Sequence, residues 1–72
     1  MRVTFDRGAN AAYIYLKNVE RGEAARQHVI DEKHGPGMIV LDFDEKGRLI
    51  GIEVLDATKA LPQEVLDSAQ RI

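Results

Sequence analysis

The sequence predicts an α+β fold, in which an antiparallel β-meander of about five short strands precedes one C-terminal helix. Three observations support this prediction. Short runs rich in β-branched and aromatic residues alternate with turn residues over positions 2–55. A hairpin with a well-defined turn lies in the second half of the chain, and a stripe of apolar residues at helical spacing follows it. The length, 72 residues, predicts a single domain over residues 1–72.

The N-terminal residues predict two strands joined by a turn. Residues 2–5 alternate in polarity, and residues 12–16 are rich in aromatic and β-branched side chains, so both runs favour strands. Residues 6–10 include glycine and asparagine, which accept positive φ, and they predict the connecting turn. A helical turn over residues 9–12 is the alternative.

A third and weaker strand is expected over residues 24–30. Its alternation is more polar, which is typical of an edge strand or of a strand with a solvated face. Polar loops over residues 17–23 and 31–37 flank it. Gly35-Pro36-Gly37 marks the second loop strongly.

Residues 38–57 predict a β-hairpin. Asp44 suits the first position of a type I turn, because its carboxylate can accept hydrogen bonds from nearby backbone amides. Gly47 suits the left-handed position that follows. The register that this turn predicts pairs Phe43 with Leu49, Asp42 with Ile50, Leu41 with Gly51, Val40 with Ile52, Ile39 with Glu53 and Met38 with Val54.

This register assigns each hairpin residue to a face, because side chains alternate across a strand. One face would hold Ile39, Leu41, Phe43, Leu49, Gly51 and Glu53. The other would hold Met38, Val40, Asp42, Ile50, Ile52 and Val54. Both faces are then largely apolar, whereas a sheet with one wet face shows apolar and polar residues in alternation. We therefore expect both faces to be covered, and we predict that the second set of six residues forms an interface with another subunit.

Residues 62–72 predict a short amphipathic helix. Pro62 is favoured in a first helical turn, and Glu64 suits the positive end of the helix dipole. The apolar stripe at helical spacing consists of Val65, Leu66, Ala69 and Ile72. A helix this short is not stable alone, so it is expected to cover one face of the hairpin.

Size and composition predict assembly. A chain of this size buries only ~60% of its unfolded surface, so its stability is marginal. The chain has no cysteine, and therefore no disulfide or thiolate metal site braces it. Burying the five apolar side chains of the predicted interface is worth roughly 7–15 kcal/mol, against a net stability of about 4–11 kcal/mol for a domain of this length. We expect a homo-oligomer, with a dimer favoured.

Charge and hydropathy exclude some partners. The formal net charge of −2 argues against a broad surface for nucleic acid or anionic membranes. No apolar run is long enough to span a membrane, and residues 1–10 lack the apolar core of a signal peptide. A cytoplasmic protein with no nucleic-acid or membrane partner is expected.

The acidic residues do not predict a catalytic site. The densest acidic group consists of Asp42, Asp44, Glu53 and Asp56. The predicted register places Asp42 and Glu53 on opposite faces, and capping of turns and loops accounts for the other two. Asp42 is the notable one, because a carboxylate amid apolar neighbours must find a partner, reach water or raise its pKa. Its candidate partners are Arg2, Arg26 and Arg48.

The other chemistry-bearing residues predict no metal or cofactor site. The spacing of His28 and His34 with Asp31 and Glu32 matches no metal motif. The glycines do not form a phosphate-binding loop, and Gly51 is expected to let a bulky neighbour approach the sheet closely. Tyr13 and Tyr15 could stack on bases, but packing in the core or in an interface is the expected role.

The chain resembles a known family. The motifs are Val3-x-Phe5-Asp6, Asn10-Ala11-x-Tyr13-Ile14-x-Leu16 and Asp42-x-Asp44-x-x-Gly47-Arg48-Leu49-Ile50-Gly51-Ile52-Glu53-Val54-Leu55-Asp56-Ala57. They look like domain-of-unknown-function family twenty-two eighty-three, which consists of small, mostly prokaryotic proteins. The resemblance covers nearly the whole chain and is loosest over residues 17–37. Members often carry Pro-Glu where this chain has Arg7-Gly8. The resemblance implies no activity and no catalytic residue.

Three functional hypotheses follow. The leading one is a non-enzymatic homo-oligomeric interaction module. The alternative is an antitoxin-type regulator that masks a small partner protein, by analogy with other small families. The third is a small enzyme or ligand carrier that uses Asp42 and a tyrosine in a pocket between subunits.

Overall fold

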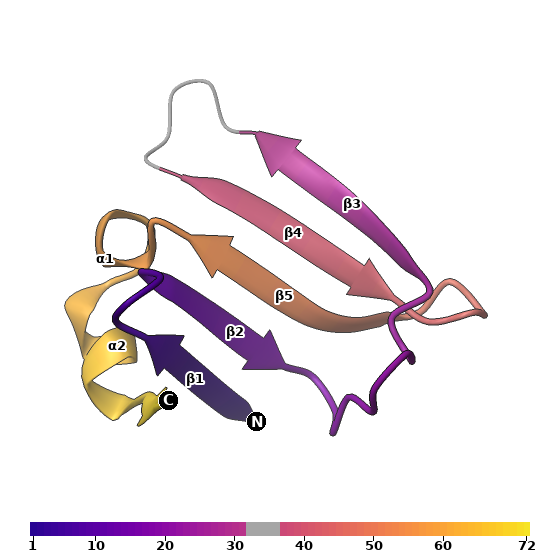
Figure 1. The fold of residues 1–72 in the computed structure, drawn as a ribbon, viewed down its shortest axis with the longest axis horizontal. Coiled ribbons are helices and arrows are strands. Elements are labelled where there is room, and N and C mark those ends of the chain that lie inside the picture. The colour runs from indigo at the N-terminus through magenta and orange to yellow at the C-terminus, as the bar shows by residue number, and fades with distance from the viewer. Residues whose placement is uncertain (32–36) are drawn as a thin grey trace.

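The sheet of the computed structural model has six strands in the order β3-β4-β5-β2-β1-β6, and the structure describes residues 1–31 and 37–72 (Figure 1). The strands are β1 (Arg2–Asp6), β2 (Ala11–Tyr15), β3 (Arg26–Asp31), β4 (Met38–Phe43), β5 (Leu49–Leu55) and β6 (Gln70–Arg71). The helices are α1 (Ala57–Ala60) and α2 (Gln63–Ser68). The α+β class predicted from the sequence is confirmed.

The predicted antiparallel meander is wrong in two respects. β2 pairs with β5 and not with β3, because β2 offers apolar side chains that suit a central position, such as Ile14 opposite Ile52. The more polar β3 takes the edge of the sheet beside β4. β6 runs parallel to β1, with Thr4 opposite Gln70, so the sheet is mixed.

The C-terminal segment also differs from the single helix predicted over residues 62–72. α1 precedes α2, and α2 ends at Ser68. The Ser68 hydroxyl donates to the carbonyl oxygens of Glu64 and Val65, both at 3.2 Å, and such bonds compete with the helical pattern. The chain then turns into β6, which leaves Ile72 71% exposed while Leu66 is buried.

The turn between β4 and β5 is the one predicted. The Gly47 amide donates to the Asp44 carbonyl at 3.0 Å, and Gly47 has a φ of 78°. The Asp44 carboxylate accepts the backbone amides of Lys46 and Arg48 at 2.9 Å each, and the Arg48 guanidinium at 2.9 Å. The bond from the Arg48 amide is the main cause that lowers the pKa of Asp44 below its usual value.

Beyond the turn the predicted register is wrong by one residue. Phe43 pairs with Leu49 as expected, but the ladder then shifts, and Ile50 is the extra residue of β5. The observed pairs are Asp42 with Gly51, Leu41 with Ile52, Val40 with Glu53 and Ile39 with Val54. Ile50 is 3% exposed, and its carbonyl accepts the Leu16 amide at 3.1 Å, so burial and this bond compensate for the bulge.

The observed register sorts the sheet into one apolar and one polar face. The apolar face holds Val3, Phe5, Ala12, Ile14, Ile39, Leu41, Ile52 and Val54. The polar face holds Arg2, Thr4, Tyr13, Tyr15, Gln27, Val40, Asp42 and Glu53. The expectation of a hairpin that is apolar on both faces is therefore wrong, because a slip of one residue exchanges the faces of a whole strand.

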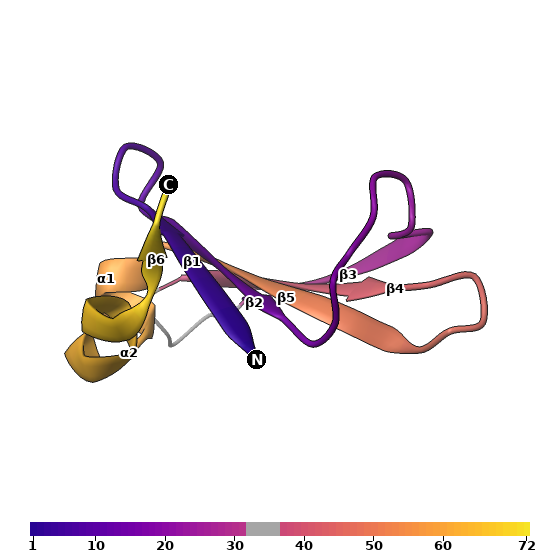
Figure 2. The same cartoon turned by 90° about the horizontal axis from the view of Figure 1, so that it is seen from below.

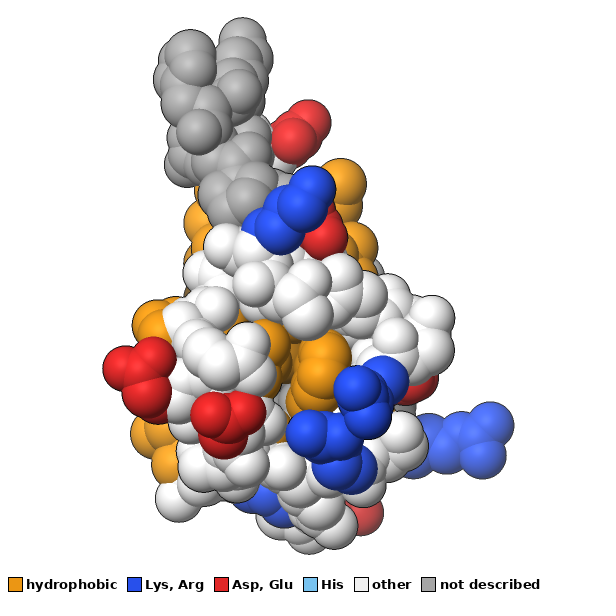
Figure 3. All heavy atoms as spheres, turned by 90° about the vertical axis from the view of Figure 1, so that its left-hand side faces the viewer, with side chains coloured by type: hydrophobic (Ala, Val, Ile, Leu, Met, Phe, Trp, Pro, Cys, Tyr) orange, Lys and Arg blue, Asp and Glu red, His pale blue; other side chains and the backbone are white. Residues whose placement is uncertain are grey.

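The two helices cover only one end of the apolar face (Figure 2). The buried core cluster consists of Phe5, Ala12, Val54, Ala57 and Leu66. Figure 3 looks at this end and shows apolar side chains in gaps between white and charged groups in the centre, and others along the margins. β3 and β4 extend away from the helices, and no other described residues form a second layer over them on the apolar side (Figure 2). The radius of gyration is 12.1 Å, larger than the ~11 Å of a compact chain of this length.

A clamp between two turns holds α1 against the sheet. Asn10 and Asp56 both adopt left-handed backbone conformations, with φ of 51° and 56°. The Asn10 side-chain amide donates to Asp56 Oδ1 at 3.1 Å and to Thr58 Oγ1 at 3.0 Å, and the Thr58 amide donates back to Asn10 Oδ1 at 3.2 Å. The predicted turn over residues 6–10 is confirmed, and the alternative helical turn does not form.

Candidate functional site

The six residues predicted to form an interface do not share one face of the sheet. Met38, Val40 and Asp42 lie on the polar face, and Ile50, Ile52 and Val54 lie on the apolar face. Four of them, Val40, Asp42, Ile50 and Val54, are already buried within the chain. Contact of any of the six with a second subunit stays a prediction.

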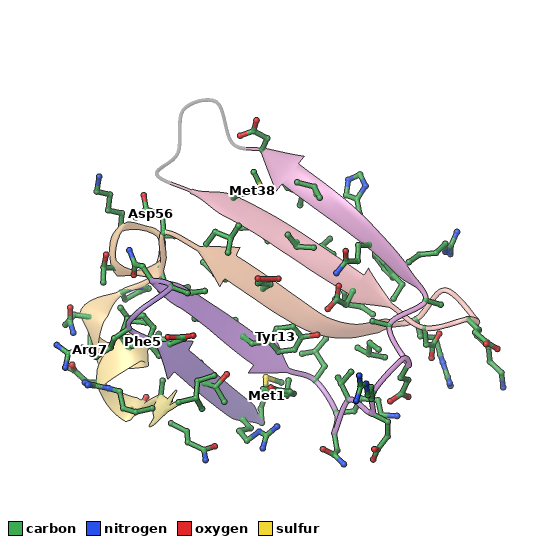
Figure 4. All side chains as sticks on the ribbon, viewed as in Figure 1. Met1, Phe5, Arg7, Tyr13, Met38 and Asp56 are labelled. Atoms are coloured by element: carbon green, nitrogen blue, oxygen red, sulfur yellow. The ribbon has the colours of Figure 1, made fainter. Side chains whose placement is uncertain are left out.

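Asp42 is the centre of a hydrogen-bond network on the polar face. It is 5% exposed, and its carboxylate accepts a bond from Tyr13 Oη at 2.6 Å and one from Gln27 Nε2 at 2.9 Å. Gln27 lies opposite Asp42 on β3, and Tyr13 projects from β2 toward β5 (Figure 4). Two donors thus satisfy a carboxylate whose burial would otherwise be costly.

The arginines expected to pair with Asp42 are elsewhere. Arg48 binds Asp44, and Arg2 stacks on Tyr15. Arg26 lies on the apolar face, because its register partner is Phe43 and not Asp42. Among the ion pairs of residues 1–31 and 37–72, none includes Asp42. Sequence reasoning missed Gln27, since its position depends on the β3–β4 register.

Gly51 makes the approach of Tyr13 possible. It pairs with Asp42 on one side and with Tyr15 on the other. A Cβ at this position would lie 2.1 Å from Tyr13 Oη, so the phenol passes over bare backbone. The expectation that Gly51 admits a bulky neighbour is confirmed, and the neighbour is Tyr13.

The network keeps the Tyr13 phenol protonated. Burial, and next the hydrogen bond to the Asp42 carboxylate, raise the pKa of Tyr13 well above its usual value of 10.0. A phenol of this kind is a hydrogen-bond donor and not a base at neutral pH. The Tyr13 phenol can therefore orient a group by donating a hydrogen bond, but it does not act as an ionised nucleophile at neutral pH.

An aromatic pair extends the polar face toward β1. The ring centroids of Tyr13 and Tyr15 are 4.6 Å apart, and the ring planes are inclined by 53°. The Arg2 guanidinium lies 4.0 Å from the Tyr15 ring centroid, from the paired position on β1. This cation–π contact ties β1 to the Tyr15 ring on the polar face.

The remaining acids and histidines do not assemble a metal site in the part of the chain that the structure describes. Glu53 shares the polar face with Asp42, so the expectation that these two acids lie on opposite faces is wrong for the same one-residue slip. Asp31 and His28 are exposed on β3. Glu32, His34, Gly35 and Pro36 lie outside the described residues. No helix among the described residues is long and apolar enough to cross a membrane.

Residues 2–57 match the model of a family described as protein of unknown function, DUF2283. The chain belongs to this family. The DUF2283 match includes the Asp42 network, Gly51 and the Asn10–Asp56 clamp, and it ends at the start of α1. No curated protein and no solved structure matches the chain significantly.

In this DUF2283 protein, Gly51→Ala should lower the free energy of unfolding by about 1–3 kcal/mol. The added methyl group displaces the Tyr13 phenol and leaves Asp42 with one donor fewer. Urea unfolding measures the change. In a Tyr13→Ala background the same substitution should be neutral or stabilising, because alanine is favoured over glycine within a strand. An equal loss in the free energy of unfolding in both backgrounds would contradict the role of Gly51 in admitting the Tyr13 phenol.

A second prediction concerns alkaline pH. Because folding raises the pKa of Tyr13, the unfolded chain loses the phenol proton at a lower pH than the folded chain does. The contribution of the Tyr13 phenol to the free energy of unfolding is complete below pH ~10 and declines as the pH rises above that value. Urea unfolding from pH 8 to 11 should show a decline that Tyr13→Phe reduces and Tyr15→Phe retains. Parallel pH profiles for the wild type and Tyr13→Phe would refute the prediction.

Proposed function

We propose that this protein is a non-enzymatic homo-oligomeric interaction module that binds a second copy of itself through the uncovered part of its apolar sheet face. The incomplete cover of that face carries the proposal. α1 and α2 pack over the end that contains Phe5, Ala12 and Val54. Six further residues on the same side, all only partly exposed, are named the open face: Val3, Ile30, Ile39, Leu41, Phe43 and Ile52.

The energy at stake supports this proposal. Complete burial of one large apolar side chain is worth ~1.5–3 kcal/mol. Even partial burial of the six side chains of the open face would then amount to several kcal/mol, comparable with the whole stability of a chain of this length. Contiguous apolar patches of this kind mark interaction surfaces in soluble proteins.

The shape of the molecule favours a second copy as the occupant. The chain measures 33 × 28 × 18 Å, so its broad faces are of the scale of the ~800 Å² that each partner buries in a standard interface. The open face is apolar, with Arg26 and His28 at its β3 margin. Such a face can pack on its own copy about a two-fold axis, as sheets do in a sandwich.

This proposal moves the contact away from most of the residues predicted from the sequence. Ile52 belongs both to the predicted set and to the open face. Val40 and Asp42 are instead held within the chain on the opposite side of the sheet. We thus still propose self-association, but for a different reason. The sequence argument relied on a hairpin that is apolar on both faces, whereas the proposal relies on one apolar face that the helices cover only in part.

Two adjacent residues of β3 test the proposal. Ile30 (37% exposed) lies on the open face, and Val29 (51% exposed) lies on the polar face. Both are exposed, so lysine at either site should leave the single chain folded, as circular dichroism will verify. Ile30→Lys should weaken dimerisation at least tenfold, because it places a charge in the contact. Val29→Lys should retain the dimer.

Sedimentation equilibrium at micromolar concentration measures the oligomeric state of the wild type and of both variants. The wild type should sediment at twice the 8.1 kDa mass of the chain. A wild-type monomer would overturn the proposal. Co-purification of that monomer with a different small protein would support the antitoxin-type alternative instead.

A further inference from the structure

We propose that a hollow on the polar face binds an alkylammonium group, carried by a free amine or by a lysine side chain. The hollow lies over β1 and β2 on the opposite side of the sheet from the open face, and its volume is about 350 Å³. Its chemistry comes from Thr4, Asp6, Tyr13, Tyr15 and Glu53. This proposal does not depend on self-association, because the two surfaces share no residue.

The charge of the hollow is negative. Asp6 and Glu53 both line it, and among its described lining residues none is basic. Asp6 Oδ1 accepts the amides of Gly8 and Ala9 at 3.0 and 3.3 Å, which fixes its carboxylate in place. Glu53 has no side-chain hydrogen bond or ion pair with any residue in the described part of the chain. Its carboxylate is therefore available to a cation.

Thr4 adds an independent indication of a ligand. It is 4% exposed, lies opposite Tyr13 on the same face and lines the hollow. Its hydroxyl has no hydrogen-bond partner among residues 1–31 and 37–72. Among the described residues no side-chain oxygen is both sealed from solvent and unpaired, so the Thr4 hydroxyl is open to the hollow and can accept a hydrogen bond from a bound donor.

The tyrosine rings complete the match to an organic cation. Tyr13 and Tyr15 line one end of the hollow, where the Tyr15 ring already carries the Arg2 guanidinium at 4.0 Å, so aromatic groups and a cation are compatible neighbours here. Burial is the largest cause of the raised pKa of Tyr13, and the charges of Asp42 and Glu53 add to it, which indicates a negative potential here. An ammonium group offers one positive charge and three donors to two carboxylates, a hydroxyl and aromatic rings.

An NMR titration of backbone amides at low ionic strength tests the site. The probes are n-butylammonium, which is the lysine side-chain group, and Nα-acetyl-lysine N-methylamide. The neutral control is n-butanol. Both cations should produce saturable shifts at Thr4, Tyr13 and Glu53, and n-butanol should not. Glu53→Gln should weaken binding about fivefold, while Glu64→Gln on α2, outside the hollow, should leave it unchanged.

The outcomes separate the sources of the ligand. Blocked lysine that binds at least threefold more tightly than n-butylammonium indicates a peptide ligand, and equal affinities indicate a free amine. Both results support an alkylammonium site. Absence of saturable shifts, equal shifts with n-butanol, or equal effects of the two glutamine variants would overturn it. Ile30→Lys should bind n-butylammonium like the wild type, so failure of one proposal leaves the other intact.

Discussion

One extra residue in β5 determines which side chains share a face of this sheet. The bulge at Ile50 pairs Leu41 with Ile52 and Ile39 with Val54, and it thereby places these apolar residues on the side of Phe5 and Ala12. A hairpin without the bulge would divide the same residues between both faces. The bulge also brings Gly51 opposite Asp42, which opens the path for the Tyr13 phenol. The helix packing and the polar network both depend on this shift.

The two faces differ in how completely their groups are hydrogen-bonded or buried. On the polar face, neutral donors from two strands satisfy the buried carboxylate of Asp42 without an arginine. On the apolar face, two short helices seal the end near β1, and within residues 1–31 and 37–72 nothing forms a second layer over β3 and β4 (Figure 2). For this reason we propose a small ligand for the polar face and a second copy of the chain for the apolar face.

The features that could be predicted from the sequence are local ones. The Asp44–Gly47 turn follows from residues that bond within a few positions, and the edge position of β3 follows from its polarity. The bulge could not be predicted, because the burial of Ile50 and its bond from the Leu16 amide, which compensate for it, exist only in the finished fold. Likewise, the parallel pairing of β6 with β1 and the choice of Gln27 as a partner of Asp42 depend on contacts between distant segments. The sequence therefore identified Asp42 and the tyrosines as candidate site residues, but it did not identify the residues that bind Asp42.

Cross-strand proton contacts measured by NMR in solution test the register most directly. The bulged register predicts nuclear Overhauser effects between the backbone protons of Leu41 and Ile52, and between those of Asp42 and Gly51. The unbulged register instead pairs Val40 with Ile52 and Asp42 with Ile50. Observation of the first set would establish the division into an apolar and a polar face, and observation of the second set would contradict it.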